Sequence, residues 1–444
     1  MAGGAGRCLR FKIIITAEAL AAAAQRQAAP AAEPGGTDMK KMEGGVCAPA
    51  GFRANSVHCG IRKNKTKRDL SLIVSDVPCA AACVYTQNLV KGAPILVTKQ
   101  NVANGIARAV VCNSGNANTC NADGIEIAEK MCALVERYAG VPAGDVVVAS
   151  TGVIGQPLPI EPIEAGMPAL VGGLLADADG SLYAAQGIMT TDTVDKQIAY
   201  SFTLGGKECH IGAIGKGVGM INPNMATMLI FVTTDAAISP AMLQKALSAD
   251  VKDSFNMVSV DGDTSTNDMV CVLANGLAGN EPVDGPGKDY NDFRKALHKV
   301  TTALCRRIAR DGEGATKLLE CRVTGAKSKA AARTVAKSVI KSSLFKAAMF
   351  GSDANWGRVL CAVGYAGAPV DITKVSVDFR SRAGEVAVCR DGSGIPFSEE
   401  EAKKVLSEDE IEVLIRLGDG SGRATAWGCD LTYDYVKING DYRT

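Results

Sequence analysis

Histidine is scarce in this chain, which holds only His58, His210 and His298 among its 444 residues. None of the three lies at ligand spacing from a second histidine or a cysteine pair, so a zinc site has little support. The chain also lacks a G-x-S-x-G elbow, the turn that carries the serine of many Ser-His-Asp hydrolases. These absences disfavour both a zinc enzyme and a hydrolase of that kind, and we expect no bound metal.

The chain also lacks an excess of either charge, since 48 basic residues face 47 acidic ones. Aromatic residues make up 5% of the sequence, which leaves no stacking platform for a single-stranded nucleic acid. Without a net field, neither nucleic acid nor an acidic lipid surface would be attracted. No stretch approaches the ~20 apolar residues of a membrane span. We therefore expect neither nucleic acid nor membrane as a partner.

Cysteine is plentiful, but the 15 cysteines include no C-x-x-C pair, and the closest two are Cys79 and Cys83. Their number is odd and they are scattered through apolar runs. A disulfide framework would be unusual in a chain of this length, so the pattern favours reduced thiols in buried cores.

The first 43 residues differ from the rest. Up to residue 36 they hold four basic residues, a long alanine tract and only two acids, Glu18 and Glu33. Such a leader resembles an organelle transit peptide, although it is short of serine. A secretory signal is the alternative because Ile13 begins an apolar run, but Glu18 interrupts that run and the cysteine usage opposes secretion. We predict a removable leader over 1–43.

Periodicity in the rest of the chain predicts a mixture of helices and strands. Apolar residues recur at helical spacing in 125–138, 241–251 and 293–308. Strands are expected at 69–74, 81–85, 107–112, 145–149, 228–234, 317–323, 375–379, 386–389, 412–417 and 424–436. Because helices and strands do not alternate strictly, the pattern predicts an α+β layered fold. The basic run 327–346 is interpreted as one solvated helix face, with a phosphate or coenzyme A patch as the alternative.

A loop rich in glycine, proline and asparagine, from 215 to 226, leads into Thr227 at the start of a buried strand. If the Ala226–Thr227 bond were cut, Thr227 would become an N-terminus whose α-amine could act as base for its own hydroxyl. That amine titrates near pH 7.7–8.0, so about neutral pH much of it can be unprotonated. A glycine-rich turn entering a strand, with no chemistry, is the alternative.

The whole stretch resembles the self-cleavage site of the ArgJ family, the ornithine acetyltransferases of arginine biosynthesis. The resemblance runs from about Gly44 to the last residue. It rests also on the segments Ser150–Gly155, Thr190–Thr193, Asp311–Lys317, Gly351–Arg358 and Asn439–Thr444. It implies sheets sandwiched by helices, similar to the N-terminal-nucleophile hydrolases. It further implies two interlocked products, an α chain at 44–226 and a β chain at 227–444.

The resemblance also implies a role for each matching residue. It makes Thr227 the nucleophile, places the cleavage between Ala226 and Thr227, and puts the oxyanion hole at Thr151 and Gly152. It assigns substrate binding to Thr193, Lys216, Thr227, Glu313, Asn439 and Thr444. Lys216 suits a substrate carboxylate, and Glu313 suits the side-chain ammonium of ornithine. Taken without the resemblance, these charges would be solvated loop residues and Thr151-Gly152 a tight turn.

The implied reaction moves acetyl from N-acetylornithine to glutamate through an acetyl-threonine intermediate, with no bound cofactor and with acetyl-coenzyme A as a candidate second donor. Two α and two β chains are expected to form a heterotetramer, located in the chloroplast, with the mitochondrion as the alternative. Two other functions stay open. One is a hydrolase related to the self-processing aminopeptidases, and the other is a non-catalytic nucleotide-binding protein built on the loop Gly212–Lys216.

Overall fold

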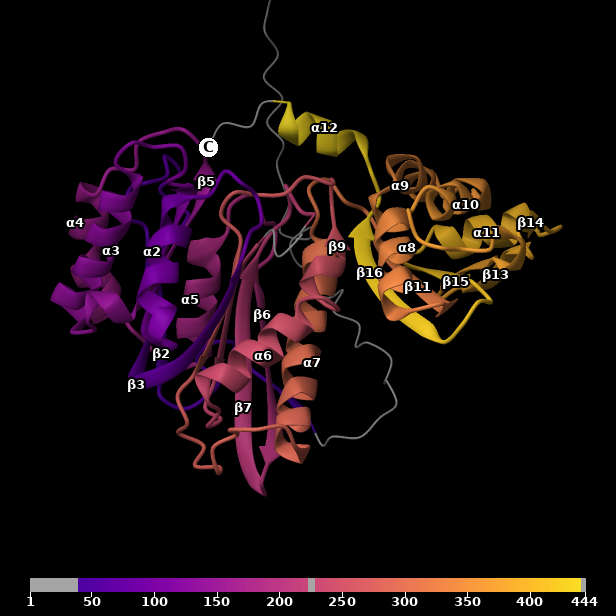
Figure 1. Cartoon of the computed structure of the whole chain (residues 1–444). Coiled ribbons are helices and arrows are strands. Elements are labelled where there is room, and N and C mark those ends of the chain that lie inside the picture. The colour runs from indigo at the N-terminus through magenta and orange to yellow at the C-terminus, as the bar shows by residue number, and fades with distance from the viewer. Residues whose placement is uncertain (1–38, 223–227, 441–444) are drawn as a thin grey trace, which may run out of the picture. The chain divides into compact units, whose positions relative to one another are not determined.

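The computed structural model describes residues 39–222 and 228–440 (Figure 1). The chain divides into residues 1–37 and a compact unit, Asp38–Thr444, and all described residues lie in the second. Strand β1 (Lys40–Met42) pairs with β6 (Lys196–Leu204), so part of the segment 1–43, predicted as a leader, belongs to a sheet. Among the described residues, no helix is long and apolar enough to cross a membrane.

Nine strands of the described region form the larger sheet, in the order β1-β6-β7-β8-β10-β3-β4-β5, with β2 paired to β3. The remaining bounds are β2 (Phe52–Val57), β3 (Leu70–Tyr85), β4 (Ile106–Asn116), β5 (Val146–Val153), β7 (Lys207–Lys216), β8 (Leu229–Thr234) and β10 (Met269–Ala274). The loop Gly212–Lys216 proposed for nucleotide binding is instead the end of β7, paired on both sides by β6 and β8. A phosphate loop needs free backbone N–H groups, so that alternative is wrong.

Strand β3 determines the shape of this sheet. The sequence predicts two strands, 69–74 and 81–85, but they are the two halves of one strand whose register against β4 shifts between Val74 and Cys79. The first half pairs with β2 and β4, and the second half pairs with β10 from Ala80 on, while the pairing with β4 ends at Ala80. Residues from the two sides of this bend, such as Val110 and Phe231, share one buried core. The sheet is therefore folded over on itself.

Helices cover the outer faces of the folded sheet (Figure 1). Helices α2 (Ala93–Asn101), α3 (Gly124–Ala139) and α4 (Glu161–Gly172) pack on the side of β2, the first half of β3, β4 and β5. Helices α6 (Pro240–Asp250) and α7 (Lys288–Arg310) pack on the other side, and α5 (Ala178–Ile188) joins the inner core. The helices expected at 125–138, 241–251 and 293–308 are thus confirmed, as is the α+β class with sheets flanked by helices.

A second sheet follows in the order β14-β13-β12-β15-β11-β16-β9. Its strands are β9 (Val258–Ser259), β11 (Leu318–Ala326), β12 (Ser376–Ser381), β13 (Gly384–Arg390), β14 (Ser393–Gly394), β15 (Glu410–Arg416) and β16 (Gly422–Cys429). Its helices are α8 (Lys329–Lys341), α9 (Ser343–Phe350), α10 (Trp356–Gly364), α11 (Glu399–Leu406) and α12 (Tyr433–Asn439). Short 3₁₀ turns occur at η1 (Val102–Asn104), η2 (Ala143–Asp145), η3 (Phe255–Met257) and η4 (Ile372–Lys374). Buried side chains of α7 join the cores of the two sheets.

Two sequence predictions are wrong in this half. The strand expected over 424–436 ends at Cys429, because the Asp430 carboxylate turns back to accept the backbone N–H groups of Thr316 and Lys317, and α12 follows. The basic run 327–346 is not one solvated face. It forms α8 and α9, and the ammonium groups of Lys337 and Lys346 turn inward to backbone carbonyls of Asn256, Val258 and Cys429. Burial lowers the pKa of Lys337 well below its ordinary value.

Candidate active site

Lys216 and Thr151 meet across the folded sheet. Lys216 is the last residue of β7, and Thr151 lies near the end of β5 on the other side of the bend. The Lys216 Nζ donates a hydrogen bond of 3.1 Å to Thr151 Oγ1. Burial lowers the pKa of Lys216, an effect that the nearby carboxylates of Asp192 and Asp268 oppose. The fold therefore places a cation against the predicted oxyanion turn.

Gly152 occupies a position that only glycine fits. Its φ is +136°, and a Cβ there would lie 2.3 Å from the carbonyl carbon of Gly115 and 2.5 Å from the nitrogen of Asn116. The register of β4 against β5 is irregular at this point, so two backbones approach closely. Thr151 and Gly152 thus lie inside β5 rather than in the tight turn expected from the sequence, and the close approach of the Gly115 backbone requires glycine at 152.

Glu313 lies just beyond the C-terminal end of α7 and joins three segments. Its carboxylate accepts hydrogen bonds from Thr191 Oγ1 at 2.7 Å and from Asn439 Nδ2 at 2.8 Å. Its backbone N–H donates to the carbonyl of Val218 at 2.9 Å. The carboxylate also packs so tightly on Gly219 that a Cβ there would lie 2.3 Å from Oε2. Helix α12 therefore brings Asn439 to the segment that precedes Thr227.

A buried ionic cluster supports these contacts. Lys196 Nζ donates to Asp192 Oδ1 at 2.7 Å and to Asp311 Oδ2 at 2.5 Å, and all three side chains are at most 6% exposed. Asp311 also accepts from the backbone N–H and the hydroxyl of Thr193, while Asp192 accepts from the N–H of Gly217 at 2.9 Å. Burial opposes ionisation of Asp192, but Lys196 and Lys216 outweigh it and hold its pKa well below the ordinary value. The two carboxylates in turn raise the pKa of Lys196, so Asp192 and Lys196 form an ion pair at neutral pH.

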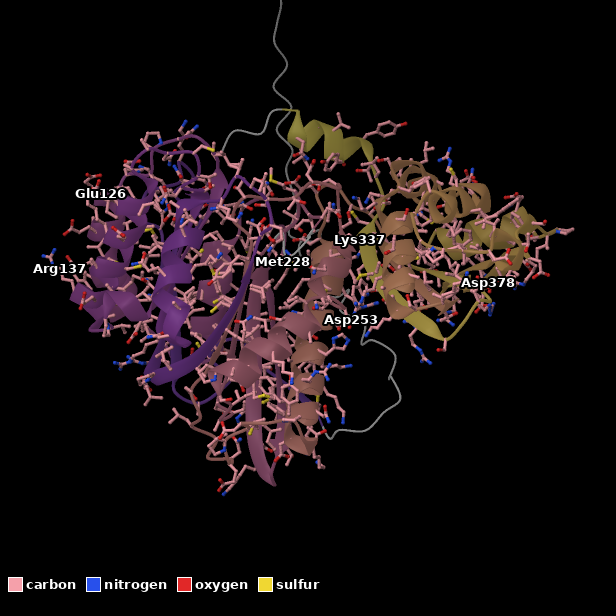
Figure 2. The ribbon with its side chains drawn as sticks, in the orientation of Figure 1. Glu126, Arg137, Met228, Asp253, Lys337 and Asp378 are labelled. Atoms are coloured by element: carbon pink, nitrogen blue, oxygen red, sulfur yellow. The ribbon has the colours of Figure 1, made fainter. Side chains whose placement is uncertain are left out.

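The predicted residues Ala226, Thr227 and Thr444 lie outside the described residues. Their described neighbours are well anchored. Met228, labelled in Figure 2, is 2% exposed, and its carbonyl accepts the N–H of Met269 at 2.9 Å. On the other side, Asn222 donates through Nδ2 to Gly262 and accepts through its carbonyl from Thr264 Oγ1, each at 2.9 Å. Met228 and Asn222, the described residues on either side of 223–227, are therefore both hydrogen-bonded to other parts of the fold.

A model of the ArgJ family matches residues 53–444. The chain belongs to the ArgJ family. It is 50% identical over 394 residues to the arginine biosynthesis bifunctional protein ArgJ 1 of Clostridium acetobutylicum, which covers 88% of this chain and 96% of the relative. It is 51% identical over 408 residues to the corresponding ArgJ protein of Symbiobacterium thermophilum, covering 91% and 100%. A solved ArgJ structure from Bacillus halodurans is 48% identical with a TM-score of 0.46, covering 48% of this chain and 99% of that one.

In this ArgJ chain the structure groups the described candidate residues in two places. Lys216 is joined to Thr151, with Gly152 beside it. Glu313 is joined to Asn439. Thr193 contacts neither group directly and donates instead to Asp311. Lys196 donates to both Asp311 and Asp192, and Asp192 accepts the N–H of Gly217, the residue after Lys216.

Sequence reasoning assigned no role to Thr191, Lys196, Asp192 or Asp311, which hold the ArgJ candidate residues in place. Asp192 and Asp311 lie inside the motifs that carry the family resemblance, so the sequence drew attention to them. Their common partner Lys196 is the first residue of β6, outside those motifs, and is separated from Asp311 by 115 residues. Spacing along a chain carries no signal for a contact at that distance.

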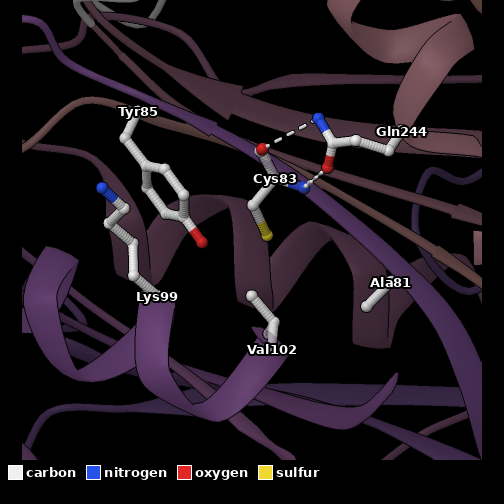
Figure 3. A pocket seen from close by; sticks show the side chains of 6 residues that line it. All are labelled: Ala81, Cys83, Tyr85, Lys99, Val102 and Gln244. Atoms are coloured by element: carbon white, nitrogen blue, oxygen red, sulfur yellow. Dashed lines mark hydrogen bonds between the residues drawn. The ribbon is translucent and has the colours of Figure 1, made fainter. Parts of the chain in front are cut away.

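A separate pocket lies away from these ArgJ residues and is lined by Ala81, Cys83, Tyr85, Lys99, Val102 and Gln244 (Figure 3). The pairing of β3 with β4 ends at Ala80, so the backbone of Cys83 lacks a strand partner on that side. The amide of Gln244 replaces that strand, accepting from Cys83 N at 3.1 Å and donating to Cys83 O at 3.2 Å. We interpret the pocket as the gap that this edge leaves in the sheet.

Proposed function

We propose that this chain cleaves itself before Thr227 and then transfers acetyl from N-acetylornithine to glutamate through an acetyl-Thr227 intermediate. As a member of the ArgJ family, the chain is an acetyltransferase of arginine biosynthesis. The observation that carries the proposed mechanism is the contact between Lys216 and Thr151, which unites a cation with the predicted oxyanion hole. Met228, next in the chain to Thr227, directly precedes β8, the strand that pairs with the one ending in Lys216.

The charges suit an amino-acid substrate with an acylated α-nitrogen. Lys216 supplies a cation for the α-carboxylate, and Glu313 supplies a carboxylate for the ammonium at the end of the ornithine side chain. The two oxygens of Glu313 each accept one protein hydrogen bond, whereas a carboxylate offers about four acceptor sites. Glu313 can therefore bind a substrate ammonium without giving up Thr191 or Asn439.

In self-cleavage, Oγ of Thr227 attacks the carbonyl carbon of Ala226 and the peptide C–N bond breaks, which leaves an ester and a free α-amine. Water opens the ester. In catalysis the same oxygen attacks the acetyl carbonyl of N-acetylornithine, the α-amine takes its proton, and that proton passes to the departing amine of ornithine. The amine of glutamate then attacks the acetyl ester. The hydroxyl of Thr151 and the N–H of Gly152 would stabilise each oxyanion; loss of one such donor typically slows catalysis by about 10²–10³-fold.

A self-processing hydrolase uses the same nucleophile and stays the alternative. Exchange of acetyl between two amines of similar basicity is nearly thermoneutral, so exclusion of water decides between transfer and hydrolysis. Release of ornithine that depends on added glutamate supports the transferase. Release at the same rate without glutamate, with free acetate as product, supports the hydrolase.

We also propose three properties that rest on the resemblance. Acetyl-coenzyme A would serve as a second donor, which would be tested by formation of N-acetylglutamate without N-acetylornithine. The two products would assemble as a heterotetramer of two α and two β chains, which sedimentation would test. The leader would direct the chain to the chloroplast rather than the mitochondrion, and a fusion of residues 1–45 to a fluorescent protein would test this; a diffuse cytosolic signal would overturn it.

The central experiment joins a denaturing gel to mass spectrometry. The wild-type chain should give a 218-residue product that begins at Thr227, together with the remainder of the first 226 residues. After incubation with N-acetylornithine alone, the peptide beginning at Thr227 should gain one acetyl mass. Thr227→Ala should stay uncut and inactive, whereas Thr227→Ser keeps the hydroxyl and should still cleave. Cleavage of Thr227→Ala at the same bond, or a label elsewhere, would overturn the mechanism.

A further inference from the structure

Asn267 lies between the two parts of the proposed catalytic centre. It is 6% exposed and sits two residues before β10. Its Nδ2 donates to the carbonyl oxygens of Ala117 and Ser150, the latter at 3.0 Å. Its Oδ1 accepts from the hydroxyls of Thr119 and Thr266, each at 2.6 Å. Both donors and both lone pairs of this amide are therefore in use.

The partners of Asn267 belong to separate elements of the fold. Ser150 directly precedes Thr151 and Gly152 within β5, and Ala117 directly follows β4. On its other side, Asn267 is two residues from Met269, whose N–H donates to the carbonyl of Met228. The backbone that carries Asn267 is thus bonded to the residue that follows Thr227, while its amide is bonded to the residue that precedes Thr151.

The amide has little room to move. A Cβ at Gly92 would lie 2.6 Å from Asn267 Nδ2, so the side chain packs directly on the backbone there. The same glycine donates its N–H to the carbonyl of Thr266 at 3.0 Å. Gly92 therefore contacts both the loop before β10, through Thr266, and the side chain of Asn267.

We propose that Asn267 is a positioning residue that holds the predicted oxyanion residues Thr151 and Gly152 at a fixed distance from β8, the strand that follows Thr227 in the sequence. This inference rests on the proposed function. Asn267 hydrogen-bonds none of the predicted substrate-binding residues in the described part of the chain. Self-cleavage, acetylation of Thr227 and its deacetylation all pass through an oxyanion at the same two residues. Loss of the amide should slow every one of these steps and leave substrate binding unchanged.

Asn267→Asp is the sharpest test, because it keeps the size and the acceptors of the side chain but removes both donors to carbonyls. We expect self-cleavage and single-turnover acetylation to slow by about ten- to hundredfold, the range expected when buried hydrogen bonds are lost. The dissociation constant for ornithine, measured by calorimetry on cleaved protein, should stay within about twofold. If Asn267 only stabilised the fold, its substitution would not slow the reaction while leaving the affinity for ornithine unchanged.

Asn55→Asp is the matched control. Asn55 is also 6% exposed, and its Nδ2 donates to the carbonyl of Leu170 at 3.0 Å, between β2 and α4. This variant should lose stability but cleave and transfer acetyl at the wild-type rate. If it slows as much as Asn267→Asp, the effect comes from stability and the proposal is wrong.

Thr119→Val provides a second test should Asn267→Asp fail to fold. Valine keeps the shape of threonine but removes one of the two hydroxyls that orient the Asn267 amide. We expect the same separation of rate from binding, with a smaller loss of several-fold. Wild-type rates in Thr119→Val, or equal loss of rate and affinity in Asn267→Asp, would overturn the inference. A wild-type chain that neither cleaves nor accepts acetyl would instead overturn the proposed function.

Discussion

The hydroxyl of Thr191 donates to the carboxylate of Glu313 at 2.7 Å, across 122 residues of chain. This contact joins the loop before β6 to the segment that follows α7, and Asn439 of α12 donates to the same carboxylate. Glu313 is therefore oriented before any substrate arrives. Preorganisation of this kind reduces the ordering that binding would otherwise require.

Substitution of Glu313 by glutamine should separate processing from turnover. The variant Glu313→Gln keeps the size of the side chain and should still cleave, because Glu313 has no assigned role at the Ala226 carbonyl. Turnover of N-acetylornithine should weaken by about 1.5–3 kcal/mol through loss of a charge-assisted contact. Steady-state kinetics of the acetylornithine half-reaction measures this. Unchanged kinetics would remove Glu313 from the site.

Substitution of Gly152 by alanine should displace the backbone N–H that is predicted to stabilise the oxyanion. A Cβ there would lie 2.3 Å from backbone carbon of Gly115, at a φ of +136°. We expect self-cleavage to slow by at least about a hundredfold, the scale for loss of an oxyanion donor. Gly140→Ala is the control, because Gly140 also has a positive φ, +68°, but has nothing within 4 Å of an added Cβ. Equal cleavage by both variants on a gel time course would show that the backbone contact at Gly152 is not needed.

Removal of Lys196 should destabilise the protein strongly. Lys196→Met leaves the carboxylates of Asp192 and Asp311 buried without their cation, a change that typically costs about 3–5 kcal/mol. Burial alone would lower the pKa of Lys196, but the two carboxylates raise it above the ordinary value. Lys196 is therefore charged at neutral pH, and the variant should lose the full stabilisation from the ion pairs there. The midpoint of urea-induced unfolding measures this loss of stability. Lys130→Met, which removes an exposed pair with Glu126, should leave the midpoint unchanged; similar shifts in the two variants would contradict the prediction.

Binding of N-acetylornithine should weaken as pH rises through the pKa of Lys216. Burial lowers that pKa, so the ammonium loses its proton below the ordinary lysine value of about 10.4. The neutral amine cannot pair with a carboxylate, and KM should therefore rise on the alkaline side. Lys216→Arg stays charged and should show no such rise. The same alkaline rise in both proteins would assign it to another group.

Much of the fold could be predicted because local patterns determine it. The apolar spacing of α3 and α7 follows directly from burial of one helix face, and the run after Thr227 is buried in β8 as expected. The bend of β3 could not be predicted, because the choice of partner for each half of the strand depends on tertiary pairing. The helix at 433–439 was missed for a similar reason: Asp430 ends the strand by contacts with a segment more than a hundred residues earlier.

In the candidate site, too, motifs predict some residues, whereas others depend on tertiary contacts. Motifs identified Thr151, Lys216 and Glu313 because their residue types suit the chemistry of the ArgJ family. The hydrogen bond between Lys216 and Thr151 depends on the fold-over of the sheet, and nothing in the spacing of 65 residues indicates it. Asn267 was missed because a buried asparagine has no sequence pattern of its own.

The strand order has a consequence for the products of a cut between Ala226 and Thr227. Strands β8 and β10 would belong to the second product, yet they lie between β7 and β3 of the first, paired on both outer edges. Pulling the products apart would expose four unpaired strand edges and open the core inside the fold. The cleaved protein should therefore behave in dilution and in exchange experiments as one folding unit, even though its chain would be in two pieces.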